Sequence, residues 1–332
     1  MKSASHPVSP SISGPVPEAV ANAPIATLSA PAPRAKDPMV SLFRYHLVAE
    51  LSELERQAQR LRTSRDMESV HRMRIATRKL RAALRAFRDF VPDADRRSIS
   101  SELQWLAAEL GKVRDLDVYE ADLADCLRSL PPDDQSALTE HQRLLGLARQ
   151  RQAEDLNEVL ASDRYRALRA TLEQFAADLA SPATLRRWGE FSIRDGVDAY
   201  LDTALAKVAR RARRFRAHPR PNRLHAVRIE NKKYRYLLEF FQPIYPEPLD
   251  KALRAARKLQ KRLGDYQDAR LAQQSIRAFS SDPNLSSQRP EELLALGRIL
   301  EAHERKAHRA SHRFSKFWSS FKDRQPSFPV AD

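Results

Sequence analysis

The run His71-Arg-Met-Arg-Ile-Ala-Thr-Arg-Lys-Leu-Arg81 returns later in the chain as His225-Ala-Val-Arg-Ile-Glu-Asn-Lys-Lys-Tyr-Arg235. A shift of 154 residues aligns the two runs, with Lys232 in place of Arg78. The same shift also aligns Arg56, Arg60, Arg62, Phe87 and Pro92 with Arg210, Arg214, Arg216, Phe241 and Pro246. A shift one residue smaller then matches Leu110-Gly111 and Asp115 with Leu263-Gly264 and Asp268. Agreement across two segments and their connection predicts an internal duplication.

Helical phase divides each run into two sides. At about 100° per residue, the cations of the first run fall within a sector of about 80°. This stripe comprises His71, Arg74, Arg78, Arg81 and Arg85, and the stripe of the second run comprises His225, Arg228, Lys232 and Arg235. The opposite side is apolar and predicts a core-facing surface, formed by Met73, Ala76, Leu80, Leu84 and Phe87 and by Val227, Tyr234, Leu237, Leu238 and Phe241.

The whole chain predicts an all-α protein with a polyanionic partner. It has 332 residues, only 7 Gly, and 21 Pro that lie mostly in the N-terminal tail or between long periodic segments. The formal net charge of +15 favours phosphate-rich polymers or anionic surfaces. We expect no transmembrane segment and no signal peptide, and therefore a cytoplasmic protein.

The predicted organisation has four parts. Residues 1–37 are rich in Pro, Ala and Ser and predict a disordered tail, as do residues 322–332. Residues 38–185 and 190–321 form the first and second helical repeats. The predicted helices span about 38–62, 66–91, 94–129, 133–161, 163–180, 192–217, 222–245, 248–280 and 290–321.

The duplicated stripe points to an anionic ligand. A solvated helix face accepts Glu as readily as Arg, yet both stripes are almost free of acids. Unrelieved like charges at i, i+3 and i, i+4 are unfavourable, and a bound anion would offset that cost. Further cations on other helices are expected to complete a channel for a chain of phosphates: Arg56, Arg60, Arg210, Arg214, Arg257, Lys258, Lys261, Arg309 and Arg313.

The sequence also suggests roles for two histidines, four aspartates and the single cysteine. His71 and His225 are candidate ligand contacts that strengthen as the imidazole protonates, the alternative being a local hydrogen bond at the helix start. Asp115, Asp117, Asp265 and Asp268 are expected to orient Arg and Lys side chains through salt bridges rather than to act in catalysis. We expect no metal site around the histidines, no cofactor, and a small core residue at Cys126.

These motifs resemble the CHAD family, the conserved histidine α-helical domain. The resemblance rests on the two histidine runs and on the Leu-Gly-x-x-x-Asp segments, and it covers residues 38–321. It implies two similar helical bundles related by a pseudo-twofold axis, a basic central pore, and an association with inorganic polyphosphate and its granules. It also implies ligand contacts from Lys79 and Lys233, besides those of the stripes. The second Leu-Gly segment has Asp265-Tyr266-Gln267 where the first has Lys112-Val113-Arg114, so the two halves need not contact ligand equally.

We therefore expect a non-enzymatic protein that binds polyphosphate, located in the cytoplasm at polyphosphate granules. One alternative is a nucleic-acid-binding protein, although the aromatic residues of the repeated helices lie on their core side rather than among the cations. The other is a phosphohydrolase or phosphotransferase, although the sequence has no Gly-rich phosphate loop and no cluster of carboxylates placed to hold Mg²⁺.

Overall fold

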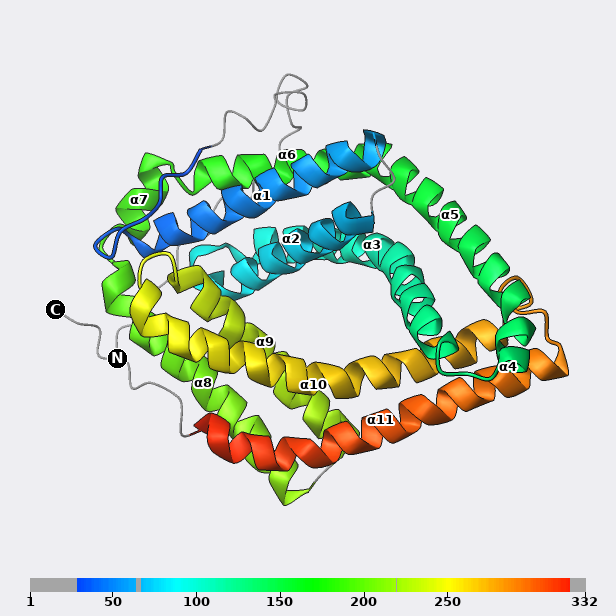
Figure 1. Ribbon diagram of the computed structural model, residues 1–332. Coiled ribbons are helices and arrows are strands. Elements are labelled where there is room, and N and C mark those ends of the chain that lie inside the picture. Colours follow the sequence, from blue (N-terminus) through cyan, green and yellow to red (C-terminus); the bar gives the residue numbers. More distant parts are fainter. Residues whose placement is uncertain (1–28, 64–66, 219, 323–332) are drawn as a thin grey trace, which may run out of the picture.

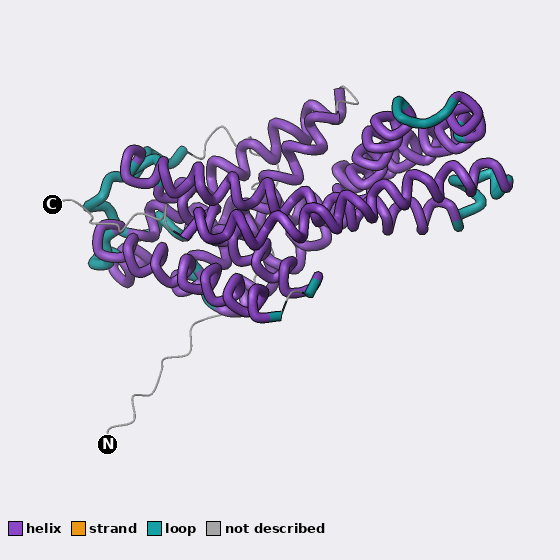
Figure 2. The backbone as a smooth tube through the Cα atoms, turned by 60° about the horizontal axis from the view of Figure 1, so that its bottom comes forward, coloured by secondary structure: helices purple, strands orange, loops and turns teal. Residues whose placement is uncertain are grey.

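The computed structural model describes residues 29–63, 67–218 and 220–322, with residues 311–322 described by their backbone alone. The predicted tail segments 1–28 and 323–332 lie outside these residues. Within them the protein is all-α, as predicted, and the only strand-like pairing is an isolated bridge between Pro38 and Ser192 (Figure 2). None of the described helices combines the length and apolarity needed to cross a bilayer.

The first half of the chain forms α1 (Met39–Thr63), α2 (Met67–Ala86), the short 3₁₀ helix η2 (Arg88–Phe90), α3 (Asp93–Leu127), α4 (Pro132–Ala137), α5 (Thr139–Ala161), α6 (Asp163–Asp178) and α7 (Pro182–Trp188). The second half forms α8 (Ile193–Ala217), α9 (Pro221–Phe241), α10 (Pro246–Ser280) and α11 (Pro290–Lys322). Helix lengths follow the sequence repeat, because α1 and α8 both have 25 residues and α3 and α10 both have 35.

The structure corrects three details of the predicted elements. Residues 29–37 are not part of a disordered tail, because the carbonyls of Ala35 and Asp37 accept hydrogen bonds from the start of α8. The helix predicted over 133–161 is broken at the fully buried Leu138, where α4 ends and α5 begins. The linker after α6 contains α7, whose first turn is capped by the Ser181 hydroxyl accepting from the Thr184 backbone N–H.

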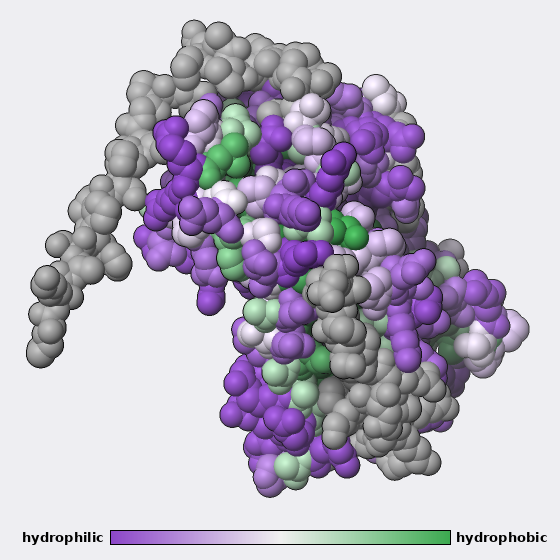
Figure 3. Space-filling model, turned by 90° about the vertical axis from the view of Figure 1, so that its left-hand side faces the viewer, coloured by the Kyte–Doolittle hydropathy of each residue, from purple (hydrophilic) through white to green (hydrophobic). Residues whose placement is uncertain are grey.

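The helices form a ring (Figure 1). Helices α2, α3, α9 and α10 surround the centre, and α1, α5, α6, α8 and α11 lie around them (Figure 1). One end of the molecule is narrower and contains α4 with the adjoining ends of α5, α10 and α11 (Figures 1 and 2). The face shown in Figure 3 is mostly hydrophilic, with apolar residues scattered over it.

A single apolar core joins the two halves. All ten predicted core-face residues are buried, and the main cluster takes residues from helices of both halves of the chain. Phe87, directly after α2, lies 5.2 Å from Phe43 of α1 and 5.9 Å from Phe240 of α9, measured between ring centroids. The main cluster therefore extends across the boundary between the two predicted repeats. A second, smaller cluster fills the narrow end between α3, α4, α5, α10 and α11.

Candidate polyanion-binding site

The cationic sides of α2 and α9 meet where these two helices pack together. The guanidinium carbon of Arg78 on α2 lies 6.0 Å from the ring centroid of Tyr236 on α9. Its positive charge acts on Arg228 and Lys232 of α9, which also face Asp268 of α10. We call Arg78, Arg228, Lys232 and Asp268 the central cluster. The structure thus brings one predicted residue of the first stripe together with two of the second.

The central cluster carries positive charge that its own residues do not neutralise. Burial, together with the charges of Arg228 and Arg78, lowers the pKa of Lys232 to about 8. Burial also lowers the pKa of Arg228, with Arg78 adding to the effect. Among the described residues, no ion pair is formed by Arg78, Arg228 or Lys232. Arg228 and Lys232 are half-buried, whereas Arg78 is exposed. Half-buried like charges are costly without a counter-ion.

The N-terminal part of the α2 stripe forms a second group of cations. Arg74 pairs with the exposed Asp115 of α3 at 3.2 Å. Burial lowers the pKa of His71, and the charges of Arg114, Arg78 and Arg74 lower it further. Arg114 was not selected from the sequence, although it immediately precedes Asp115 in the Leu-Gly segment.

The other predicted carboxylates differ in their partners. Asp117 is fully buried at its side chain and contacts Arg149 of α5 at 2.7 Å and Arg114 at 3.8 Å. Asp268 belongs to the central cluster, and burial raises its pKa, with the charge of the exposed Asp265 adding to that rise. The charges of Arg228, Lys306 and Lys232 oppose this rise in the pKa of Asp268.

The two histidines have different surroundings. The ring of His71 is partly buried among arginines, whereas His225 is exposed and its Nδ1 lies 2.9 Å from the Gln267 Oε1. Gln267 stands where the first half has Arg114. The two halves are thus electrostatically unequal at the positions where their Leu-Gly segments differ.

Lys79 and Lys233 do not join the central cluster. Lys79 turns toward α1 and pairs with Glu50 at 2.6 Å, and Lys233 pairs with Glu230 at 3.0 Å. Each follows its stripe residue by one position, which rotates it by about 100° around the helix. The contacts that the family resemblance implied for these two lysines are therefore not supported by their placement. Arg235 likewise pairs with Glu239.

The remaining predicted cations are spread over several surfaces. Arg85 and Arg210 line a cleft beside α8, and Arg214 lines a separate hollow of about 330 Å³ with Arg211 and Arg223. Arg56 pairs with Glu53, and Arg257 lies 3.4 Å from Glu239. Arg81 is half-buried, and burial lowers its pKa. Arg60, Lys258, Lys261 and Arg309 are exposed, and the side chain of Arg313 lies outside the described residues.

One group of three described residues has donor atoms placed as in a metal site. The ligand atoms of Asp122, Cys126 and His303 lie within 4.8 Å of one another, at the narrow end of the molecule. His303 Nε2 is 2.8 Å from Asp122 Oδ2, and the hydrogen bond with Asp122 raises the pKa of His303 to about 9. A charged pair between Asp122 and His303 accounts for this arrangement. Cys126 is half-buried at the edge of the second core cluster rather than inside it.

The comparisons with known proteins agree with this helical architecture. The family model described as CHAD domain matches residues 46–277. The chain belongs to the CHAD family. Its fold is similar to the crystal structure of the CHAD domain from the plant Ricinus communis, with a TM-score of 0.72 and 22% identity over 92% of this chain and 97% of that chain.

A second solved structure is similar in fold, at lower similarity. PptA from Streptomyces chartreusis has a TM-score of 0.62 and 19% identity, over 85% of this chain and 99% of that chain. At such identities, the two structures establish the CHAD fold and not the ligand. No curated protein matches the chain.

Proposed function

We propose that this CHAD protein binds inorganic polyphosphate without hydrolysing it, at the central cluster and the adjoining cations of α2. The observation that carries the proposal is the meeting of Arg78, Arg228 and Lys232, which crowd three positive charges together without an ion-pair partner among the described residues. A chain of phosphates supplies closely spaced negative charges that relieve this repulsion. Arg74 and Arg114 extend the cationic surface along α2 and α3, and His71 lies among these arginines. Such binding would place the protein at polyphosphate granules in the cytoplasm.

The direct test is a calorimetric titration with polyphosphate of defined length at fixed ionic strength. Duplex DNA is then added as a competitor at the same salt concentration, because both polymers bind through phosphates and weaken as salt rises. Efficient displacement of polyphosphate by DNA would favour the nucleic-acid-binding alternative. A parallel overnight incubation with polyphosphate and Mg²⁺ is assayed for released phosphate, and sustained turnover would overturn non-catalytic binding.

Polyphosphate affinity should also depend on pH through Lys232. Its pKa of about 8 means that the ammonium loses its proton over the range in which binding is measured. A bound phosphate favours the charged form, so we expect the affinity to fall about tenfold between pH 7 and pH 9 if the bound complex keeps the proton. Titrations at constant ionic strength across this range check the expectation.

The matched control is Lys232→Arg, which keeps a positive charge but removes the titration from this range. The arginine variant should retain its affinity up to pH 9. An identical fall in both proteins would assign the pH dependence to another group and remove Lys232 from the binding site.

A further inference from the structure

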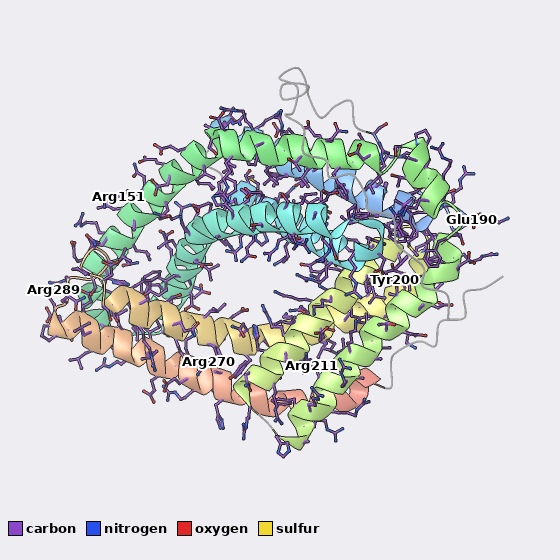
Figure 4. The ribbon with its side chains drawn as sticks, turned by 180° about the vertical axis from the view of Figure 1, so that it is seen from behind. Arg151, Glu190, Tyr200, Arg211, Arg270 and Arg289 are labelled. Atoms are coloured by element: carbon purple, nitrogen blue, oxygen red, sulfur yellow. The ribbon has the colours of Figure 1, made fainter. Side chains whose placement is uncertain are left out.

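A cleft lies on the side of α2 and α9 that faces α8. We call it the α8 cleft. Its volume is about 490 Å³, and its walls come from the C-terminal half of α2, from α8 and from α9. Its apolar lining includes Tyr200, Tyr236, Leu237 and Phe240, of which Tyr236 and Phe240 are almost fully buried. Figure 4 views the molecule from this side and labels Tyr200 on α8.

Cations surround this apolar lining. Arg85 of α2 and Lys207 and Arg210 of α8 are exposed, and none of them forms an ion pair within the described part of the chain. The two acids of the cleft already have partners, because Glu230 pairs with Lys233 and Asp89 lies 3.5 Å from Arg88. Three positive charges thus remain without a counter-charge. Polyphosphate would use these cations but not the aromatic surface beneath them.

The sequence repeat allows the α8 cleft to be compared with the corresponding place beside α1, where the residues differ. The 154-residue shift places Glu50 at the position of Ala204, Glu53 at that of Lys207, and Glu239 at that of Arg85. On the α1 side, Glu50 pairs with Lys79 at 2.6 Å, so a buried acid and its partner occupy the space that Ala204 leaves open on the α8 side.

The aromatic wall also differs between the two sides. His46 occupies the position that corresponds to Tyr200, and its Nε2 lies 2.8 Å from the carbonyl oxygen of Phe240. Burial lowers the pKa of His46 to about 4, so this ring is neutral and belongs to the packed interior. Positions related by the repeat are thus filled and acidic beside α1, but open and basic beside α8.

We propose that the α8 cleft binds a small organic phosphate that carries an aromatic ring, such as a nucleoside diphosphate. The ring packs against the partly exposed Tyr200, and the phosphates lie among Arg85, Lys207 and Arg210. The volume is within the range of about 300–1,000 Å³ that small-molecule sites occupy. This site does not depend on polyphosphate binding, because Arg228 and Lys232 do not line the α8 cleft. Tyr236 separates the two sites, since Arg78 lies over its ring.

The experiment compares three probes by calorimetry on the full-length protein: ADP, pyrophosphate and adenosine. ADP has both the ring and the phosphates, whereas each of the others has one of them. We expect ADP to bind at least tenfold more tightly than either. Ala204→Glu and Lys207→Glu introduce the acids found at the corresponding positions of α1, and each should weaken ADP binding at least tenfold.

Ala206→Glu is the matched control, because it adds the same charge to an exposed position of α8 that does not line the cleft. This variant should bind ADP within about threefold of the wild type, and circular dichroism should show all variants to be helical. Equal binding of ADP and pyrophosphate, or equal losses in Ala204→Glu and Ala206→Glu, would overturn the proposal. Polyphosphate binding is measured on the same variants and should persist in Ala204→Glu, so failure of one site is distinguishable from failure of the other.

Discussion

A variant in which Arg74, Arg78, Arg228 and Lys232 are all alanine should bind polyphosphate at least a hundredfold more weakly than the wild type. A hydrogen bond to a charged group contributes about 1.5–3 kcal/mol when it is formed between partly desolvated partners. The two residues of α9 are half-buried, so solvent screens their charges less than those of surface cations. Even if the four side chains together contribute only about 2.8 kcal/mol, the loss is a hundredfold. Calorimetry at fixed salt measures it, and circular dichroism establishes that the variant is folded.

The control for this variant removes the same charge from elsewhere. Arg151, Arg186, Arg187 and Arg289 are exposed, and Figure 4 shows Arg151 and Arg289 at the outer edge of the ring. Replacing these four arginines by alanine lowers the net charge equally but leaves the central cluster intact. The affinity of this control variant for polyphosphate should fall less than fivefold. Similar losses in the two variants would mean that general positive charge, and not the meeting of α2 and α9, determines the affinity.

Salt dependence provides a second readout of the same comparison. Each phosphate contact that releases a counter-ion adds to the slope of log affinity against log salt concentration. The slope should become shallower in the central-cluster variant and change little in the outer-edge variant. The slope thus reports the number of phosphate contacts independently of the absolute affinity.

The sequence predicts the helix faces well because their periodicity is local. An apolar side chain every third or fourth residue places Met73, Leu80 and Phe87 on one side of α2 whatever the helix packs against, and all three are buried. The helical class and the family follow from the repeated motif in the same way. The break at Leu138 and the packing of residues 29–37 depend instead on contacts with distant helices, α11 and α8, which leave no period in the sequence.

The candidate site is less predictable because it depends on how the two halves meet. The angular position around the helix places Arg85 in the same stripe as Arg78. In the structure, however, Arg85 lines the α8 cleft, whereas Arg78 faces Arg228. Charge counting cannot separate Lys79, which has a buried carboxylate partner, from Lys232, which has none among the described residues. Arg114 could have been found from its place in the Leu-Gly segment, immediately before Asp115. Tyr236 could not, since its role comes from a contact between α2 and α9.

The narrow end of the molecule holds a buried polar network. The side chains of His141 and Glu292 are fully buried, and His141 Nδ1 lies 3.2 Å from Glu292 Oε1. The other ring nitrogen of His141 lies 2.9 Å from the hydroxyl of Tyr119, while Glu292 accepts from the Ser287 backbone N–H and hydroxyl. The network ties the start of α11 and the preceding loop to α5 and α3.

Replacing Glu292 by alanine should lower the free energy of unfolding by about 2–4 kcal/mol, because each buried polar group left without a partner costs about 1–3 kcal/mol. The variant leaves the Ser287 donors and His141 unsatisfied in an apolar cluster. Glu292→Gln is the control, since its amide oxygen can still accept hydrogen bonds from Ser287. Its free energy of unfolding should fall markedly less than that of the alanine variant. Denaturant unfolding at pH 7 provides the comparison, and a loss below about 1 kcal/mol in the alanine variant would contradict the network's structural role.

The structural role of Glu292 also predicts in which direction the free energy of unfolding changes with pH. Burial raises the pKa of Glu292, but the hydrogen bonds from Ser287 and Ser286 and the charge of His141 together hold it below its usual value of 4.5. A lowered folded-state pKa contributes stability that is present above the unfolded-state pKa and is lost as the pH falls through the folded-state value. The wild type should therefore lose stability relative to Glu292→Gln below about pH 4.5, because only the wild type must protonate this carboxylate. Parallel stability curves for the two proteins in this range would mean that Glu292 is not held as a carboxylate in the folded state.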